Sequence, residues 1–151
     1  MPRVLDVPNH IRAALKGKQS ALKSLAKLED TLAAGRSPPA RLLKASGSSS
    51  AGDFEPYKTL GLHHAKLDFS GQNGGDPLLV LQEASPDRLT ALALTDHRSY
   101  ASTDPARCRA WLWELREDID WSISAEASTL LEALTKEFEP AAPSGSPRGR
   151  R

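Results

Sequence analysis

Apolar residues near the N-terminus recur at the spacing of an amphipathic helix. Over residues 8–35 they follow one another at intervals of three, four and seven, with lysines between them. Gly17 is expected to divide this run into two helices, and Gly35 to end it. A short strand, RVLDVP (3–8), precedes this helical hairpin. The recurring apolar residues are Ile11, Leu15, Leu22, Leu25, Leu28 and Leu32.

The middle of the chain changes to short apolar runs that predict β-strands. After the Ser/Gly-rich loop at 45–53, strands are expected over residues 63–69, 76–84 and 88–97. The turn-forming stretches GQNGGD and SPD separate them and are short enough for an antiparallel meander. The continuous run LLVL in the second of these strands predicts a central strand that is covered on both faces.

Helical spacing returns after residue 102. Asp104 and Pro105 are expected to begin a helix as its N-cap and first residue. A second helix should begin near Ser122 or Ser124 and end at Pro140. The apolar residues of the two helices are Cys108, Trp111, Leu112, Leu115 and Ile119, then Ala127, Leu130, Leu131, Leu134 and Phe138.

This order of elements predicts an α+β fold. An N-terminal strand and a helical hairpin would pack on a small antiparallel sheet, with two additional C-terminal helices and with the helices against one face of the sheet. The expected organisation is a core at 1–101, a C-terminal helical extension at 102–139 and a disordered basic tail at 140–151. A chain of 151 residues is long enough to bury a core of its own.

Charge is distributed unevenly, although the formal net charge of the chain is only +1. Residues 1–51 contain nine Lys/Arg and three Asp/Glu, a balance of +6, whereas residues 104–139 contain four and nine, a balance of −5. The basic half can meet a polyanion and the acidic half a basic partner, although lysines between leucines are also typical of a solvated helix face.

Cysteine count and hydropathy exclude several classes of protein. A single cysteine, Cys108, cannot form an intrachain disulfide or a CxxC metal cluster. No apolar run approaches 18 residues, and the N-terminus has no apolar stretch of the kind found in signal peptides. We therefore expect a cytoplasmic protein that does not bind membranes.

Residues able to transfer protons or hold phosphate charge fall near the expected strands. RNA cleavage without a metal or other cofactor needs an acceptor for the 2′-OH proton, a donor for the leaving 5′-oxygen and cations for the pentavalent transition state. Histidine, lysine and arginine supply these groups, and a tyrosine can stack on a base. The candidates are His63, His64 and Lys66 on the first meander strand, Asp76 at the beginning of the second, and His97, Arg98 and Tyr100 at the end of the third.

Each candidate also has a purely structural interpretation. Adjacent residues on a strand point to opposite faces, so only one of His63 and His64 can face a shared site. Asp76 can cap a turn, Tyr100 can pack over the edge of the sheet, and His97 can be an ordinary residue at the end of a strand. The spacing of these residues does not define a specific motif.

Taken together, residues 2–101 resemble the RelE/ParE superfamily of toxins from bacterial type II toxin–antitoxin systems, and within it the YafQ-like or HigB-like branch. The resemblance rests on the order of elements: a short strand, a helical hairpin rich in Lys and Leu, and an antiparallel meander. It also rests on the ending Thr95-Asp96-His97 with Tyr100 after it. The stretches that carry it are RVLDVP, YKTLGLHHAKLDFSG, DPLLVLQ and LTALALTDHRSY.

The resemblance implies a function. Toxins of this kind are endoribonucleases that cleave mRNA, commonly in the ribosomal A site, leave a 2′,3′-cyclic phosphate and are restrained by a cognate antitoxin protein. By this resemblance His97 is the candidate catalytic histidine, His63 or His64 and Asp76 assist it, and Lys66 and Arg98 hold phosphate.

The chain also departs from the family. It is longer and less basic than typical members, and the acidic helices between Asp104 and Glu139 have no counterpart in the minimal fold. ParE-type members act on gyrase and lack ribonuclease chemistry, so the fold does not decide the activity. Two alternatives therefore stay open: a gyrase-directed toxin, and a non-catalytic prophage or plasmid protein whose acidic helices bind a partner.

Overall fold

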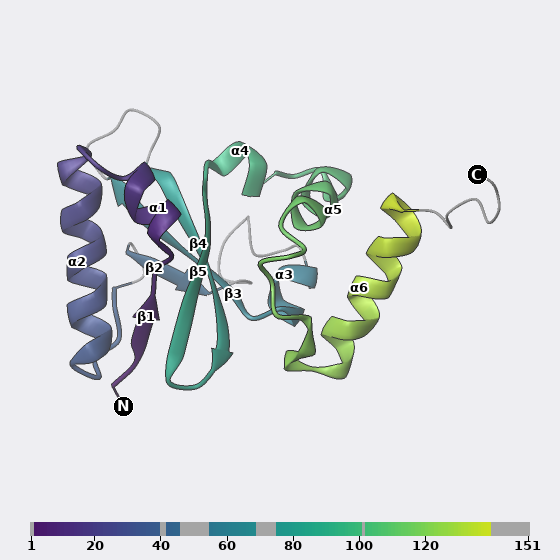
Figure 1. The fold of residues 1–151 in the computed structure, drawn as a ribbon, viewed down its shortest axis with the longest axis horizontal. Coiled ribbons are helices and arrows are strands. Elements are labelled where there is room, and N and C mark those ends of the chain that lie inside the picture. Colours follow the sequence, from purple (N-terminus) through teal and green to yellow (C-terminus); the bar gives the residue numbers. More distant parts are fainter. Residues whose placement is uncertain (1, 40–41, 46–54, 69–74, 101, 140–151) are drawn as a thin grey trace.

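The structure is a computed structural model that describes residues 2–39, 42–45, 55–68, 75–100 and 102–139. Its sheet lies at the centre of the molecule, with helices on two sides (Figure 1). In chain order the elements are β1 (Val4–Asp6), α1 (Asn9–Ala14), α2 (Gln19–Ala33), β2 (Leu43–Ala45), α3 (Glu55–Thr59), β3 (Leu62–Asp68), β4 (Gly75–Ser85), β5 (Arg88–Thr95), α4 (His97–Tyr100), α5 (Pro105–Glu114), the 3-10 helix η2 (Trp121–Ile123) and α6 (Ala125–Phe138).

The described part of the chain is an α+β fold with one five-stranded mixed sheet and six α-helices. The strand order is β1-β5-β4-β3-β2, with antiparallel pairing from β2 to β5. The predicted meander is confirmed, but the prediction of a fully antiparallel sheet is wrong because β1 runs parallel to β5. No hairpin turn joins these two strands, so their direction is not constrained in the way that a tight turn constrains a meander.

The sheet is covered on both faces, which corrects the prediction that the helices pack against one face. Leu79 and Leu81 of β4 pack in the core beneath α1 and α2. Leu78 and Val80 pack in the core formed with α3, α5 and α6. Because side chains alternate along a strand, the apolar run LLVL requires a cover on each side. All four side chains are buried, as predicted for a central strand.

The N-terminal hairpin forms as two helices, α1 and α2, as predicted. Gly17 lies between them with a φ of 84°, a left-handed conformation that glycine adopts without steric cost. Leu25, Leu28 and Leu32 of α2 are buried, while the two lysines of this helix, Lys23 and Lys27, are exposed. The helix therefore covers the sheet with its apolar side and presents its charged side chains to solvent.

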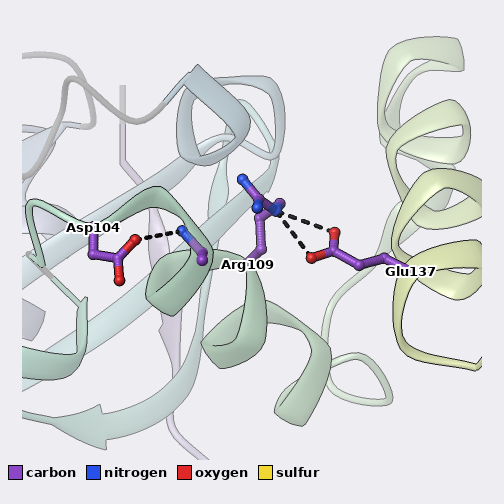
Figure 2. A network of polar contacts seen from close by, with 4 residues as sticks. Asp104, Arg109 and Glu137 are labelled. Carbon is purple, nitrogen blue, oxygen red and sulfur yellow. Dashed lines mark hydrogen bonds and ion pairs between the residues drawn. The ribbon is translucent and has the colours of Figure 1, made fainter.

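The C-terminal helices begin at the predicted caps. The Asp104 side chain accepts a hydrogen bond of 3.0 Å from the backbone N–H of Ala106, and Pro105 is the first residue of α5 (Figure 2). Ser124 caps α6 in the same way, by accepting from the backbone N–H of Ala127 at 3.0 Å. Each cap satisfies a donor that the helix itself leaves unpaired.

The C-terminal helices share a core with the sheet. Cys108 and Trp111 of α5 are buried in the same cluster as Tyr57 of α3 and Leu62 of β3. Arg109 of α5 joins α6 through its Nε, which lies 3.1 and 3.3 Å from the carboxylate oxygens of Glu137 (Figure 2). The predicted tail at 140–151 and most of the predicted loop at 45–53 lie outside the described residues.

Candidate functional site

Several candidate residues lie at one end of the sheet, where β5 ends. Thr95 is opposite Leu78 of β4, and Leu78 is opposite Lys66 of β3, so the three residues form a row across the strands. Neighbouring strands are about 4.8 Å apart, which places the Cα atoms of Lys66 and Thr95 about 10 Å from each other. Asp76, near the beginning of β4, and His97, just after β5, belong to this same end of the sheet.

A single turn of helix, α4, follows β5 directly, so the strand predicted over 88–97 ends at Thr95 instead. Asp96 accounts for the difference. Its Oδ1 accepts from the Ser99 N–H at 2.9 Å, and its carbonyl accepts from the Tyr100 N–H at 3.1 Å. Aspartate is a preferred N-cap residue, and this signal in the sequence could have indicated the turn.

Arg98, His97 and Asp76 are the candidate polar residues at this end of the sheet, and the structure describes the side chain of Arg98 alone among them. Arg98 is exposed to solvent on α4. For His97 and Asp76 the structure describes the backbone, and their side chains lie outside the described part. The structure therefore places the backbone of His97 beside an exposed arginine at the end of the sheet that also holds Lys66.

Tyr100 is buried, which assigns it a packing role instead of the expected base-stacking role. The residue is 1% exposed. Its ring stacks on that of Tyr57 with centroids 4.4 Å apart, and it meets the Trp111 ring edge-on at 5.4 Å. A ring enclosed by two other aromatic rings is not accessible to a nucleic-acid base in this structure.

The two adjacent histidines face opposite sides of the sheet, as predicted. His64 is buried on the side of α4, with its ring 5.2 Å from that of Tyr100. His63 lies on the other side, where its Nε2 is 2.9 Å from Oε1 of Glu83. Burial lowers the pKa of His63, and Glu83 partly opposes this effect. The sheet itself separates His63 from His64 and from α4. His63 and His64 therefore cannot both assist a reaction at α4.

Sequence reasoning missed two residues on the α4 side of the sheet. Lys44 of β2 is directly opposite His64, so its side chain leaves the sheet on the same face, which is also the face of Lys66. The Tyr57 hydroxyl donates a hydrogen bond of 2.7 Å to the carbonyl of Tyr100. Burial raises the pKa of Tyr57 far above its usual range, which keeps this hydroxyl protonated.

No signal in the sequence identified either residue. Lys44 belongs to a three-residue strand whose register depends on β3, and Tyr57 acts through a contact 43 residues away in the chain. The face with α4 thus carries two lysines and a buried histidine, and α4 adds Arg98. Lysine and arginine are residue types that can hold an anion such as a phosphate group.

Within the described residues, no group of three His, Cys, Asp or Glu side chains is arranged to hold a metal ion. Over the same part of the chain, no helix has the length and apolar character required to cross a membrane. Neither family models, nor curated proteins, nor solved structures give a significant match to this chain.

Proposed function

We propose that the protein is a RelE/ParE-like toxin of a toxin–antitoxin pair and that it cleaves mRNA as an endoribonuclease in the cytoplasm. The observation that carries the proposal is the sheet end at which Lys66, Arg98 and the backbone of His97 occur together. The order of elements also supports it, because a strand, a helical hairpin and a meander follow one another here as they do in these toxins.

The proposed reaction is attack of a ribose 2′-oxygen on the adjacent phosphorus. A new O–P bond closes a 2′,3′-cyclic phosphate, and the bond from phosphorus to the 5′-oxygen breaks. A base removes the 2′-OH proton and an acid returns a proton to the leaving oxygen. We assign proton transfer to His97, whose residue type titrates near neutral pH, and charge stabilisation in the transition state to Lys66 and Arg98.

The outer surface of the N-terminal hairpin is basic and lies on the other side of the sheet from α4, so it attracts RNA outside the proposed site. Four lysines of this hairpin and its connection are exposed to solvent and lie on the opposite side of the sheet from the acidic helices. Such a surface attracts a polyanion, whether mRNA or ribosomal RNA, with an affinity that falls as salt is raised. These residues are Lys16, Lys18, Lys23 and Lys27.

Expression in an unprotected bacterial host tests the proposal. The wild-type chain should arrest translation and growth, and His97→Ala should restore both. His10→Ala is the matched control, because His10 is exposed on α1 and should leave toxicity unchanged. Purified protein, alone or with ribosomes on an mRNA, should produce RNA fragments that end in a 2′,3′-cyclic phosphate. A harmless wild type, or a His97→Ala variant that is equally toxic, would contradict the nuclease proposal.

The proposed partner is a cognate antitoxin. A gene for a small DNA-binding protein should lie next to the gene for this chain, and co-expression of that protein should abolish the growth arrest. If growth stops while mRNA stays intact and DNA is damaged, the target is gyrase and the protein is a ParE-like toxin.

The burial of His64 and Tyr100 favours a second candidate function. Both belong to the core, as expected if the end of β5 serves packing instead of catalysis. The protein would then be a non-catalytic interaction or regulatory protein whose acidic C-terminal segment, residues 104–139, binds a basic partner. Under this alternative, the wild-type chain is harmless to the host and does not cut RNA.

A further inference from the structure

The position of α4 depends on contacts with the rest of the molecule. Four residues form only about one turn, and isolated helices of this length are unstable in water. The turn is held at its beginning by Asp96, as described above. Its end is held at the carbonyl of Tyr100, which accepts hydrogen bonds from two other helices, α3 and α5.

Two donors from different elements meet at this carbonyl. The hydroxyl of Tyr57, on α3, donates at 2.7 Å. The thiol of Cys108, on α5, lies 3.8 Å from the same oxygen and 3.4 Å from the carbonyl oxygen of Ser102. Both donors are buried, so their hydrogen bonds are shielded from competition by water.

Aromatic contacts add directional packing to these hydrogen bonds. The rings of Tyr57 and Tyr100 are parallel, with an interplanar angle of 0°. Trp111 of α5 presents its ring edge-on to both, with centroids 5.9 Å from Tyr57 and 5.4 Å from Tyr100. Stacked and edge-on pairs have preferred geometries, so the three rings fix the relative positions of α3, α4 and α5.

The C-terminal helices anchor this junction on its outer side. Asp104 caps the beginning of α5, and the Arg109–Glu137 ion pair joins α5 to α6 (Figure 2). Cys108 and Trp111 occur on α5 on either side of Arg109 in the sequence. The extension that has no counterpart in the minimal toxin fold thus contacts α4 directly.

We propose that Tyr57, Cys108 and Trp111 are positioning residues: through the carbonyl and ring of Tyr100, they hold α4 so that His97 and Arg98 stay at the end of the sheet. The roles of His97 and Arg98 in this inference rest on the proposed function. The C-terminal helices then serve as a support for the site, and loosening them reduces turnover without removing any group that contacts RNA.

Tyr57→Phe is the first test, because it removes the hydroxyl and keeps the stacked ring. We expect the amides of Ser99 and Tyr100 to exchange hydrogen roughly tenfold faster than in the wild type. We expect kcat for RNA cleavage to fall roughly tenfold with KM changed less than about twofold, since the groups that bind RNA are retained. Ser128→Ala is the matched control, because it removes another hydroxyl that donates to a backbone carbonyl, that of Trp121 at 3.1 Å.

A pair of substitutions at Cys108 tests the contribution of α5. Cys108→Ala removes the donor to the carbonyls of Tyr100 and Ser102 and should accelerate exchange at Ser99 and Tyr100. Cys108→Ser keeps a donor of similar size and should retain exchange rates and kcat closer to those of the wild type.

The inference is overturned if exchange in α4 is unchanged in Tyr57→Phe and Cys108→Ala, or if it increases equally in Ser128→Ala and throughout the central strand β4. Failure of the proposed function gives a different result. In that case the wild-type protein does not cleave RNA, while exchange in α4 still responds to Tyr57→Phe and the structural part of the inference stands.

Discussion

The two sides of the central sheet have cores of different chemistry. Beneath α1 and α2, the buried cluster of described residues consists of leucine, isoleucine and alanine. On the other side, the cluster contains Tyr57, Tyr100, Trp111 and Cys108. The buried polar side chain of Gln82 lies on this side as well. The same strand, β4, supplies apolar residues to both sides.

The two cores therefore contribute differently to the fold: one mainly stabilises it, and the other also specifies how its elements are placed. Burial of aliphatic surface stabilises a fold but has little directional preference. Hydrogen bonds and aromatic edges have narrow geometries and specify how elements are placed. The short turn α4 lies on the side with the directional contacts, and the N-terminal hairpin, with its exposed lysines, lies on the aliphatic side. The following predictions test this comparison, beginning with the largest effect.

Leu28→Ala should produce the largest loss of stability on the aliphatic side. Leu28 is fully buried in α2. Removing a buried leucine side chain loses transfer free energy and leaves a cavity, so we expect the free energy of unfolding to fall by about 3 kcal/mol. Urea denaturation provides the measurement. Lys27→Ala, at an exposed neighbouring position, should change stability by less than about 0.5 kcal/mol, and equal effects of the two substitutions would contradict the comparison.

Gln82→Leu should be the most damaging polar-to-apolar exchange on the other side. The Gln82 amide donates to the carbonyls of Leu60 at 3.1 Å and Asp120 at 2.9 Å. Its Oε1 accepts from the Asp120 N–H at 2.8 Å. Leucine is similar in size but leaves these backbone groups without their partner, which should cost about 2 kcal/mol.

The control for Gln82→Leu is Gln19→Leu, at an exposed position where the exchange should be nearly neutral. If Gln82→Leu stabilises the protein in urea denaturation, the polar contacts on this side of the sheet are not required to place η2 and the chain around Asp120.

These features show how far the sequence alone could predict the structure. The helices α2, α5 and α6 and the strands of the meander were predictable, because each has a long periodic pattern or a clear cap such as Asp104. The elements β2, α3 and α4 are three to five residues long and have no periodicity to detect. Their positions are set by tertiary contacts, for example the pairing of Leu43 with Ala65.

The candidate site was predictable to a similar extent. The meander order implied that Lys66 and the end of β5 belong to one end of the sheet, and alternation implied that His63 and His64 face opposite sides. The burial of Tyr100 could not be predicted, because it depends on Tyr57 and on a helix that begins after residue 104. The assignment of helices to one face failed because periodicity shows which side of a helix is buried and does not show which face of a sheet it covers.

Asp104→Ala should have a smaller effect than either core substitution. The carboxylate caps α5, and its loss leaves the Ala106 N–H without its acceptor (Figure 2). We expect a decrease of about 1 kcal/mol in the free energy of unfolding, whereas Asp104→Asn, which keeps a cap oxygen, should change it much less. Equal losses in the two variants would show that the charge matters more than the cap.

The smallest expected effect concerns His63, the polar residue on the aliphatic side. Burial lowers the pKa of His63 below its usual 6.5, so the folded state binds fewer protons than the unfolded state once pH falls below about that value. The contribution of His63 to stability is therefore complete above pH 6.5 and decreases as pH falls toward the folded-state pKa. Urea midpoints at pH 7.5 and 5.5 should differ more in the wild type than in His63→Gln.

Glu83→Gln tests separately how the neighbouring carboxylate affects the pKa of His63. The carboxylate lies 2.9 Å from Nε2 of His63 and favours the protonated ring, so it opposes the effect of burial on the pKa. Without it, the pKa of His63 should fall further and the loss of stability between pH 7.5 and 5.5 should become larger. If, relative to His63→Gln, the wild type instead became more stable between pH 7.5 and 5.5, the ion pair and not burial would control the pKa of His63, and the aliphatic side would also depend on a directional polar contact.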